Sequence, residues 1–402
     1  MGSGFRIGRI FGINVRVDWS WLFIFFLVTW NLASVFGQVQ PDWQPLFRWI
    51  VAGVAALLFF GSVLAHEMAH SLVARAQGLP VRNITLFLFG GVSNIQREPD
   101  SPREEFVMAL VGPLTSIVLG AVLVLIANLT ADPAASLTRD PLGLLGQLSP
   151  VTLLLFWLGS VNILVGLFNL IPGFPLDGGR VLRSIFWAAT DNLRRATRWA
   201  AGVGQGVAWL LILTGLAMVF GVQVPIFGTG LIGGLWLAFI GWFLNSAAIQ
   251  SYQQVVIRDI LEGIPVSRMM RPNPPTVTEG ITVSSLVYDY VMAADDRAFP
   301  VFDDGRMTGI VTVEDLRKVD RSRWDETLVR QIMTPAAQLV TIGPDEEASE
   351  ALNRLAQRDI RQLPVVQEGQ LVGLLRRRDL IRWLQLHSEL AREAPGGPRI
   401  PA

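Results

Sequence analysis

The 402-residue sequence contains no cysteine, which excludes disulfide bonds and leaves the redox compartment open. Charge is scarce: 16% of the residues are Asp, Glu, Lys or Arg, against about 25% in a typical soluble domain, while 51% are hydrophobic. The formal net charge of zero gives no sign of a nucleic-acid partner. Because charged residues are sparse up to residue 250 and dense beyond it, we expect a membrane part followed by a soluble part.

Long apolar runs occupy the first part. A helix needs roughly 20 apolar residues to cross a bilayer of about 30 Å, and six runs approach or exceed that length. They cover residues 19–36, 49–74, 106–128, 151–170, 199–222 and 226–244. A shorter run, 181–190, is expected to form a helix on or partly in the membrane. Before the first span, Ile13, Val15 and Val17 alternate with polar residues, which predicts a half-buried strand and not a cleavable signal peptide.

Arginines mark every second loop. They are concentrated before the first span, between the second and third spans, and between the fourth and fifth, whereas the alternate loops hold little charge. Loops rich in Arg and Lys stay on the cytoplasmic side of a membrane. We therefore expect a multi-pass protein of the cell (inner) membrane whose two termini and soluble part are cytoplasmic.

The second apolar run contains His66-Glu67-Met68-Ala69-His70. Two histidines four residues apart lie on one helix face and can bind one ion, and the glutamate between them can act on a water without being a ligand. Ionisable side chains are costly inside a membrane and mark functional sites there, although an accidental match in a polar helix is the alternative. The third histidine, His387, is near the C-terminus and is expected at the surface.

A catalytic zinc takes three protein ligands and keeps one position open. Since no spare histidine or cysteine is near the motif, the third ligand has to be a carboxylate. The best candidate is Asp177, in the segment Asn-Leu-Ile-Pro-Gly-Phe-Pro-Leu-Asp-Gly-Gly-Arg that covers residues 169–180. Its prolines and glycines would break the helix, and irregular backbone at membrane depth is tolerated where it lines a cavity. An ordinary loop that ends in an Asp-Gly-Gly turn is the alternative.

Together these motifs resemble the site-2 protease family of intramembrane zinc metalloproteases. The resemblance covers the histidine helix, the segment around Asp177 and the order of the spans between them. It implies that His66, His70 and Asp177 bind one zinc ion per chain and that Glu67 is the general base. It also implies that Asn169 helps to hold the substrate peptide or the oxyanion, the alternative being an amide in helix packing.

Two further segments fit this family. Residues 83–95, with Gly90-Gly91, alternate weakly and resemble its membrane-inserted hairpin, whose open edge could pair with an unwound substrate; a plain surface hairpin is the alternative. Gly112-Pro113 resembles its Gly-Pro motif, but Ser116 stands where Asn is common, which weakens any role assigned there. Gly112, Ser116 and Gly120 are four residues apart and could equally serve close helix packing.

After residue 250 the sequence repeats itself. Residues 270–272 recur at 333–335, and residues 299–310 recur at 363–374, an offset of 63 or 64 residues. Each unit holds a helical stretch, two short β-rich runs joined by a polar turn, and a closing helix. This order of elements resembles a tandem pair of cystathionine-β-synthase-type (CBS) domains.

Such pairs often bind adenine nucleotides in the cleft between their units. The resemblance implies that Thr312 and Asp315 of the first unit meet phosphate and ribose. In the second unit Asp379 is kept, but Arg376 replaces the hydroxyl residue, so one of the two sites could be altered or lost. The alternative is that the pair serves only gating or the formation of a homodimer.

The expected fold is an α-helical multi-span membrane protein of about six transmembrane helices with small β elements, followed by a soluble α/β tandem CBS module. We place the membrane-embedded metalloprotease domain at 1–250, the CBS domains at 251–325 and 326–390, and a disordered tail at 391–402. The expected function is cleavage of membrane-anchored protein substrates within the lipid bilayer, regulated by nucleotide binding to the CBS pair. A CBS-gated transporter or channel with a zinc site and a catalytically silent zinc-binding scaffold are the alternatives.

Overall fold

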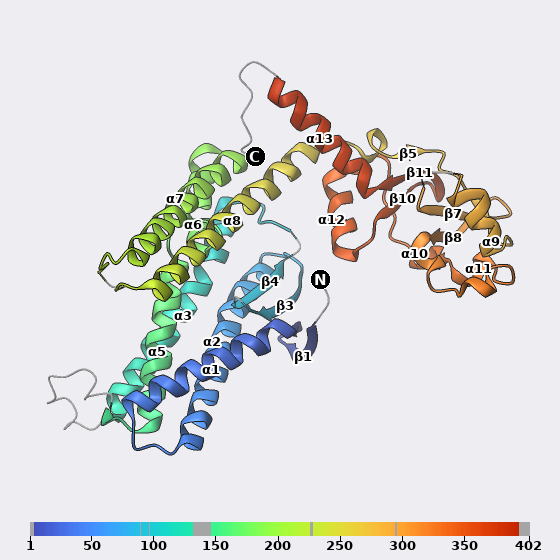
Figure 1. Ribbon diagram of the computed structural model, residues 1–402. Helices are drawn as coiled ribbons and strands as arrows, with labels where there is room; N and C mark the ends of the chain where they lie inside the picture. The colour runs from blue at the N-terminus through green and yellow to red at the C-terminus, as the bar shows by residue number, and fades with distance from the viewer. Residues whose placement is uncertain are drawn as a thin grey trace. The chain divides into compact units, whose positions relative to one another are not determined.

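The computed structural model describes residues 4–88, 90–95, 97–131, 146–225, 228–293 and 296–393. They form two compact units, Met1–Gln253 and Gln254–Ala402, and each is considered by itself. The first unit holds the long helices and one sheet, and the second holds two small sheets with short helices (Figure 1).

Six helices among the described residues are long and apolar enough to cross a membrane, which confirms the expected number. Between the fourth and the fifth lies a shorter helix, α6 (Asp177–Thr190), which contains the run expected at 181–190 and has Asp177 as its first residue. The six long helices are α1 (Trp19–Val39), α2 (Pro45–Ala76), α3 (Pro102–Thr130), α5 (Pro150–Asn169), α7 (Leu193–Val219) and α8 (Leu231–Leu261).

The fifth span, expected at 199–222, begins and ends earlier. As α7 it starts at Leu193, because the side chain of Asn192 caps the helix by accepting a hydrogen bond from the Arg195 N–H (2.8 Å). Its first turns contain arginines, which favour a helix but interrupt the apolar run. Hydropathy alone therefore predicted a start of the helix that is too late in the sequence.

The sixth span, expected at 226–244, is displaced in the other direction. As α8 it begins at Leu231, after Gly228 and Gly230, whose φ angles of 79° and 124° lie outside any right-handed helix. The helix then continues to Leu261, beyond the apolar run. Helix formation and membrane burial therefore have different limits here.

A four-stranded sheet in the order β1-β2-β3-β4 accompanies the helices. β2 and β3 are parallel, and the other two neighbouring pairs are antiparallel. Ile13, Val15 and Val17 of β2 are buried, which confirms the predicted half-buried strand. Ile13 and Val15 pack with Met68 of α2, so the sheet supports the helical turn that holds the two histidines. The strands are β1 (Gly4–Ile10), β2 (Ile13–Asp18), β3 (Val81–Phe87) and β4 (Gly90–Ile95).

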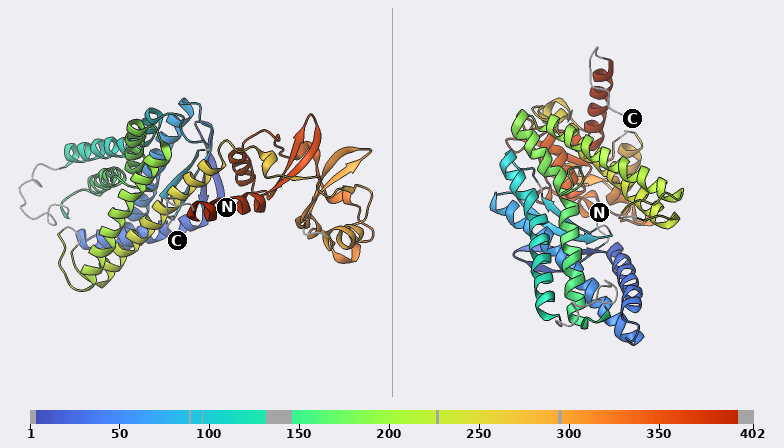
Figure 2. Two further views of the ribbon diagram at one scale, coloured as in Figure 1. Left: turned by 90° about the horizontal axis from the view of Figure 1, so that it is seen from above. Right: turned by 90° about the vertical axis from the view of Figure 1, so that its left-hand side faces the viewer.

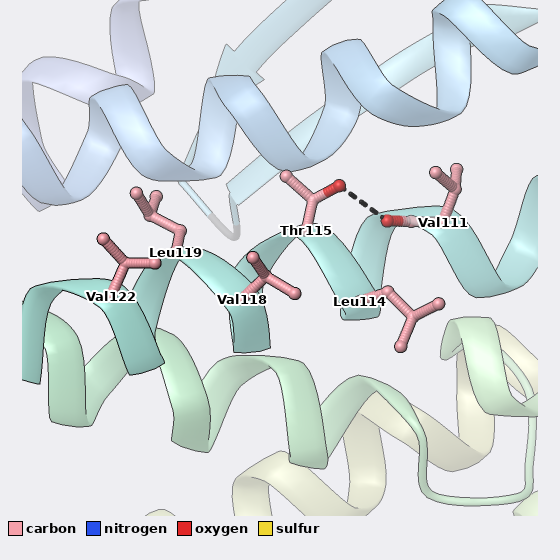
Figure 3. Close-up of a pocket in the computed structure, with 6 residues that line it drawn as sticks. All are labelled: Val111, Leu114, Thr115, Val118, Leu119 and Val122. Carbon is pink, nitrogen blue, oxygen red and sulfur yellow. Dashed lines mark hydrogen bonds between the residues drawn. The ribbon is translucent and has the colours of Figure 1, made fainter. Parts of the chain in front are cut away.

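Helix α3 contacts α2, α5 and α6 and lies side by side with α2 and α5 (Figure 1, Figure 2). Its contact with α5 is close, because a Cβ atom on Gly120 would collide with the Gly159 carbonyl of α5. The opposite strip of α3 is apolar and open: Leu114 and Val118 are 45% and 60% exposed. Figure 3 shows these side chains lining a shallow hollow on α3, as expected of a surface that faces lipid.

The second unit contains the two sequence repeats, each built around one small sheet. The first sheet has the order β6-β7-β8-β9, and the second has the order β10-β11-β5. Its strands are β5 (Arg271–Pro272), β6 (Val277–Thr278), β7 (Ala298–Asp303), β8 (Arg306–Thr312), β9 (Thr334–Pro335), β10 (Gln362–Gln367) and β11 (Gln370–Arg376). Its helices are α9 (Val283–Ser285), α10 (Val313–Leu316), α11 (Val329–Ile332), α12 (Ala348–Arg358) and α13 (Arg377–Glu393), together with the π-turn Leu286–Val291 and 3₁₀ turns at Val266–Arg268, Arg321–Arg323 and Ala336–Gln338.

The repeats exchange strands. β9, at the start of the second repeat, pairs with β8 of the first, and β5, at the start of the first repeat, pairs with β11 of the second. This reciprocal exchange gives the unit an approximate two-fold symmetry. Of the expected disordered tail at 391–402, the first three residues belong to α13 and the remainder lies outside the described residues, as does the side chain of His387.

Candidate metal centre

His66 and His70 lie one turn apart on α2 and are buried, with 6% and 5% of their surface exposed. Their Nε2 atoms are 3.2 Å apart. The Oδ2 atom of Asp177 lies 3.1 Å from His66 Nε2 and 3.2 Å from His70 Nε2. Asp177, distant in the sequence, thus lies with the two histidines so that one atom of each residue could ligate the same metal ion.

The chain between α5 and α6 brings Asp177 to the histidines. This irregular segment is held tightly against its surroundings, because a Cβ atom on Gly178 would collide with the carbonyls of Leu170 and Ile171. Gly173 is in similarly close contact with Gly204 of α7. Only glycine allows these approaches, so the glycines fix the place from which α6 starts.

The second nitrogen of each imidazole is held by α3. Nδ1 of His66 is 3.0 Å from the Ser116 hydroxyl, and Nδ1 of His70 donates to the carbonyl of Met108 (2.6 Å). A histidine whose Nδ1 is bonded in this way turns its Nε2 lone pair toward the metal. Ligand atoms bound tetrahedrally to zinc at about 2.0–2.2 Å lie roughly 3.3–3.6 Å apart, close to the separations found here. The residues present therefore fit a zinc ion with three protein ligands and one open position.

Gly112 of α3 leaves room for both imidazoles. A Cβ atom at this position would collide with Nε2 of His70 and crowd Nε2 of His66. Of the small residues considered for helix packing, Gly120 does contact α5, whereas Gly112 and Ser116 face the histidines. The departure from the family pattern at Ser116 therefore still provides a contact to a candidate ligand.

Glu67 lies on α2, and its half-buried side chain faces β4. Its Oε2 atom accepts a hydrogen bond from the Ser93 hydroxyl (2.7 Å), and a Cβ atom on Gly91 would collide with the Glu67 side chain. The expected hairpin at 83–95 is present as β3 and β4, and its second strand positions this carboxylate.

A buried ion pair joins the helix that carries Asp177 to α3. Arg183 of α6 donates through Nε to Glu105 Oε1 (2.6 Å), and its Nη2 bonds to the same oxygen. Glu105 is fully buried and Arg183 is 4% exposed. Arg180 lies 3.7 Å from Glu105, and Glu98 lies 3.7 Å from Arg183. These two contacts extend the pair into a network of four charges.

Sequence reasoning did not find the supporting contacts of Ser93, Met108, Glu105 and Arg183. Met108 acts through its backbone carbonyl, which no side-chain pattern reveals. Arg183 was counted only among the arginines between the fourth and fifth spans and Glu105 was not singled out, although their spacing from Asp177 and Gly112 could have drawn attention to them.

Asn169 is the last residue of α5, and its side-chain amide donates to the Val165 carbonyl of the same helix (3.0 Å). The buried Asn162 makes the same kind of bond, to Leu158 (2.8 Å). A role of Asn169 toward substrate remains a prediction.

In the second unit, Thr312 and Asp315 lie together at the start of α10, whereas Asp379 is paired with Arg376.

Comparison with known proteins supports the reading of both halves. Residues 54–213 match the peptidase family M50, and residues 266–322 and 329–386 match the CBS domain. Rip3 of Mycobacterium tuberculosis is 36% identical over 98% of this chain and 96% of its own length, and the protein sll0528 of Synechocystis sp. is 35% identical over 96% of each. Both are named as zinc metalloproteases. The structure of the site-2 protease from Methanocaldococcus jannaschii covers 62% of this chain and 95% of its own, at 26% identity and a TM-score of 0.41.

The fold and the converging site define a multi-pass membrane zinc metalloprotease with a soluble CBS pair. The chain belongs to peptidase family M50, the family of site-2 proteases. This membership sets aside the alternative of a CBS-gated transporter or channel.

Proposed function

We propose that the chain is an intramembrane endopeptidase that hydrolyses a peptide bond in a membrane-anchored protein, as a step of regulated intramembrane proteolysis. The observation that carries this proposal is the meeting of His66, His70 and Asp177 at 3.1–3.2 Å, with both histidines and Glu67 on a helix that is apolar enough to span a bilayer. Such a group has no structural use in an apolar environment, where unpaired ionisable side chains are costly.

His66, His70 and Asp177 would hold the zinc ion through two Nε2 atoms and one carboxylate oxygen. When bound, zinc supplies a Lewis acid that polarises the scissile carbonyl and activates water. Glu67, fixed by Ser93, takes the proton from the attacking water and passes it to the leaving amine. Asn169, at the end of α5, is assigned to hold the substrate peptide or the oxyanion.

The substrate would enter as an extended strand beside β4. β4 is at the edge of its sheet, with β3 as its neighbour on one side. Backbone groups at an edge strand can pair with an added peptide, and β4 also carries Ser93 and Gly91, which contact Glu67. A substrate on that edge would therefore lie next to the general base.

We also assign a topology and a domain division. The Arg-rich loops support a topology in which the protein lies in the inner membrane of the cell and both termini and the CBS pair are cytoplasmic. His66 precedes Ala74, near the end of α2 that leads into an arginine-rich loop, by about 12 Å along the helix at about 1.5 Å per residue, so the zinc would lie within the bilayer on the cytoplasmic side. The membrane domain would cover 1–250 and the CBS domains 251–325 and 326–390.

The decisive experiment compares cleavage of a single-span reporter by the wild type and by Glu67→Gln. The variant should bind zinc in a 1:1 ratio yet lose cleavage by at least about 100-fold, because a positioned general base contributes about 10²–10⁴-fold to the rate. Glu262→Gln removes an exposed carboxylate of the same chain and should cleave normally. Equal cleavage by wild type and Glu67→Gln would disprove the mechanism.

For the CBS pair we propose regulation of cleavage by an adenine nucleotide at Thr312 and Asp315, with homodimer formation as an additional role. Thr312 and Asp315 form a capping box, in which each side chain accepts from the backbone N–H of the other, and the Thr312 hydroxyl also donates to Asp315 Oδ2 (2.7 Å). A hydroxyl next to a carboxylate offers partners for a phosphate and for the ribose diol. Added ATP should change the cleavage rate of the wild type and leave that of Asp315→Asn unchanged.

A further inference from the structure

The strand exchange makes two positions of the CBS pair equivalent. Ile310 of β8 pairs with Thr334 of β9, and Leu374 of β11 pairs with Arg271 of β5, at the repeat offset of 64 and 63 residues. We call residues 309–315 the first motif and residues 373–379 the second motif. A symmetric pair would offer the same groups to a ligand at both motifs.

The second motif is filled by its own arginine. Arg376 donates through Nε to Asp379 Oδ2 (2.7 Å) and through Nη2 to Asp379 Oδ1 (2.8 Å), so both carboxylate oxygens are engaged. This is the two-point geometry in which Arg–carboxylate pairs are strongest. Asp379 raises the pKa of the Arg376 guanidinium, which stays charged. A ribose diol could reach Asp379 only by breaking this pair.

The first repeat contributes a third member to this network. Asp296, which is 4% exposed, accepts a hydrogen bond from Arg376 Nη1 at Oδ1 (2.7 Å) and from Arg271 at Oδ2. Arg378 lies 3.6 Å from the same carboxylate. The guanidinium of Arg376 therefore bridges carboxylates of both repeats, and all three of its nitrogens are occupied.

The first motif has a different composition. Position 312 holds a threonine where the second motif has Arg376, and the residue that corresponds to Asp296 is Ile360. Asp315 Oδ1 accepts from Lys318 (2.7 Å); the Asp315 side chain is 7% exposed, whereas that of Lys318 is 71% exposed. A single bond from a cation so well solvated contributes little free energy and exchanges readily with other partners. A ligand hydroxyl can thus replace Lys318, and the released ammonium can meet a phosphate.

We propose that the CBS pair binds one adenine nucleotide per chain, at the first motif, and that the Asp379–Arg376–Asp296 ion pairs close the second motif. The inference rests on the nucleotide-binding role proposed above. Asp379, expected from the family resemblance to contact a nucleotide, is then a structural partner of Arg376 instead. The network also joins the two repeats, since Asp296 belongs to the first and Arg376 to the second.

The test is the binding stoichiometry of radiolabelled ATP and, in parallel, AMP, measured by equilibrium dialysis on the full chain in detergent. Wild type should bind one nucleotide per chain. Thr312→Arg, which copies the arginine of the second motif into the first, should weaken binding at least ten-fold. The double variant Arg376→Thr/Asp296→Ile installs the residues of the first motif in the second and should bind two. Arg330→Thr removes an exposed arginine of the same unit and should still bind one.

The outcomes separate the two proposals. Two nucleotides bound by the wild type, or one bound by a double variant whose melting temperature matches the wild type, would overturn the closed second motif. Unchanged affinity of Thr312→Arg would overturn the assignment of the first. If neither the wild type nor the double variant binds ATP or AMP, the nucleotide role itself is wrong, while the peptidase proposal still stands or falls with Glu67→Gln.

Discussion

Ser116 is the side chain that holds the first candidate ligand, because its hydroxyl lies 3.0 Å from His66 Nδ1. Replacing it by alanine should free the imidazole to rotate and weaken zinc binding about 10–100-fold, the usual effect of losing such a supporting contact. The measurement is zinc affinity by competition with a chromogenic chelator.

Ser62→Ala is the matched control for this substitution. Ser62, on α2, is buried like Ser116. Among the described residues its hydroxyl donates only to the Phe59 carbonyl of its own helix (2.7 Å). It should bind zinc as tightly as the wild type. If Ser116→Ala and Ser62→Ala have the same affinity, Ser116 does not position His66.

Gly112 is a second residue that controls the geometry of the candidate zinc site, because an added methyl group would displace the ligands. A methyl group there would collide with His70 Nε2, so Gly112→Ala should abolish 1:1 zinc binding. Overpacking of this kind also destabilises a fold by about 1–3 kcal/mol, so the melting temperature has to be recorded with the zinc content.

Gly61→Ala provides the comparison, since a Cβ atom at Gly61 would meet nothing within 4 Å beyond its chain neighbours and the adjacent backbone of its own helix, among the described residues. This variant should keep both zinc and stability. A Gly112→Ala protein that still binds one zinc per chain would show that the histidines are not confined as the structure places them.

At the level of elements, α3 positions the whole site. Glu105, Met108, Gly112 and Ser116 are spaced by three or four residues, so they lie on one face of the helix. That face contacts both histidines directly and reaches Asp177 through the helix α6. A shift of α3 would therefore move all three candidate ligands together.

The Glu105–Arg183 pair is the contact through which α3 holds α6. Arg183→Met leaves the buried Glu105 carboxylate without its main partner, which typically costs about 3–5 kcal/mol. The free energy of unfolding in detergent should fall by that amount, and zinc affinity should fall with it because Asp177 begins the same helix.

Arg354→Met is the control for this prediction. Arg354 pairs with Glu346 and Glu350 in the second unit, where its side chain is 28% exposed and those of the glutamates are 40% and 47% exposed. Such a pair contributes about 0–1 kcal/mol. If Arg183→Met is no more destabilising than Arg354→Met, the buried pair does not fasten α6.

At the level of the whole molecule, hydropathy and repeats were sufficient to predict six helices, one short helix and two similar units. They worked because lipid demands apolar runs and because duplicated units keep their pattern. The predicted start residues of two helices were wrong, because hydropathy does not decide where these helices begin. The helix α7 begins at Leu193, after a side-chain cap, and α8 begins at Leu231, after two glycines. The pairing of Asp177 with the histidines was inferred from the lack of other ligand types and from family resemblance, whereas the close packing of glycines between α5 and α6 that creates it is visible only in the structure.

The division into two units predicts how the protein responds to loss of metal. The candidate zinc ligands all lie in the first unit, and the first motif with its own hydrophobic core lies in the second. Treatment with 1,10-phenanthroline should therefore abolish reporter cleavage and leave ATP binding at one per chain. Adding back zinc should restore cleavage, because the ligands are preorganised by contacts of the protein itself. Cleavage that persists in protein shown by elemental analysis to be free of metal would contradict a zinc peptidase, and loss of ATP binding together with zinc would mean that the two units do not fold independently of the metal.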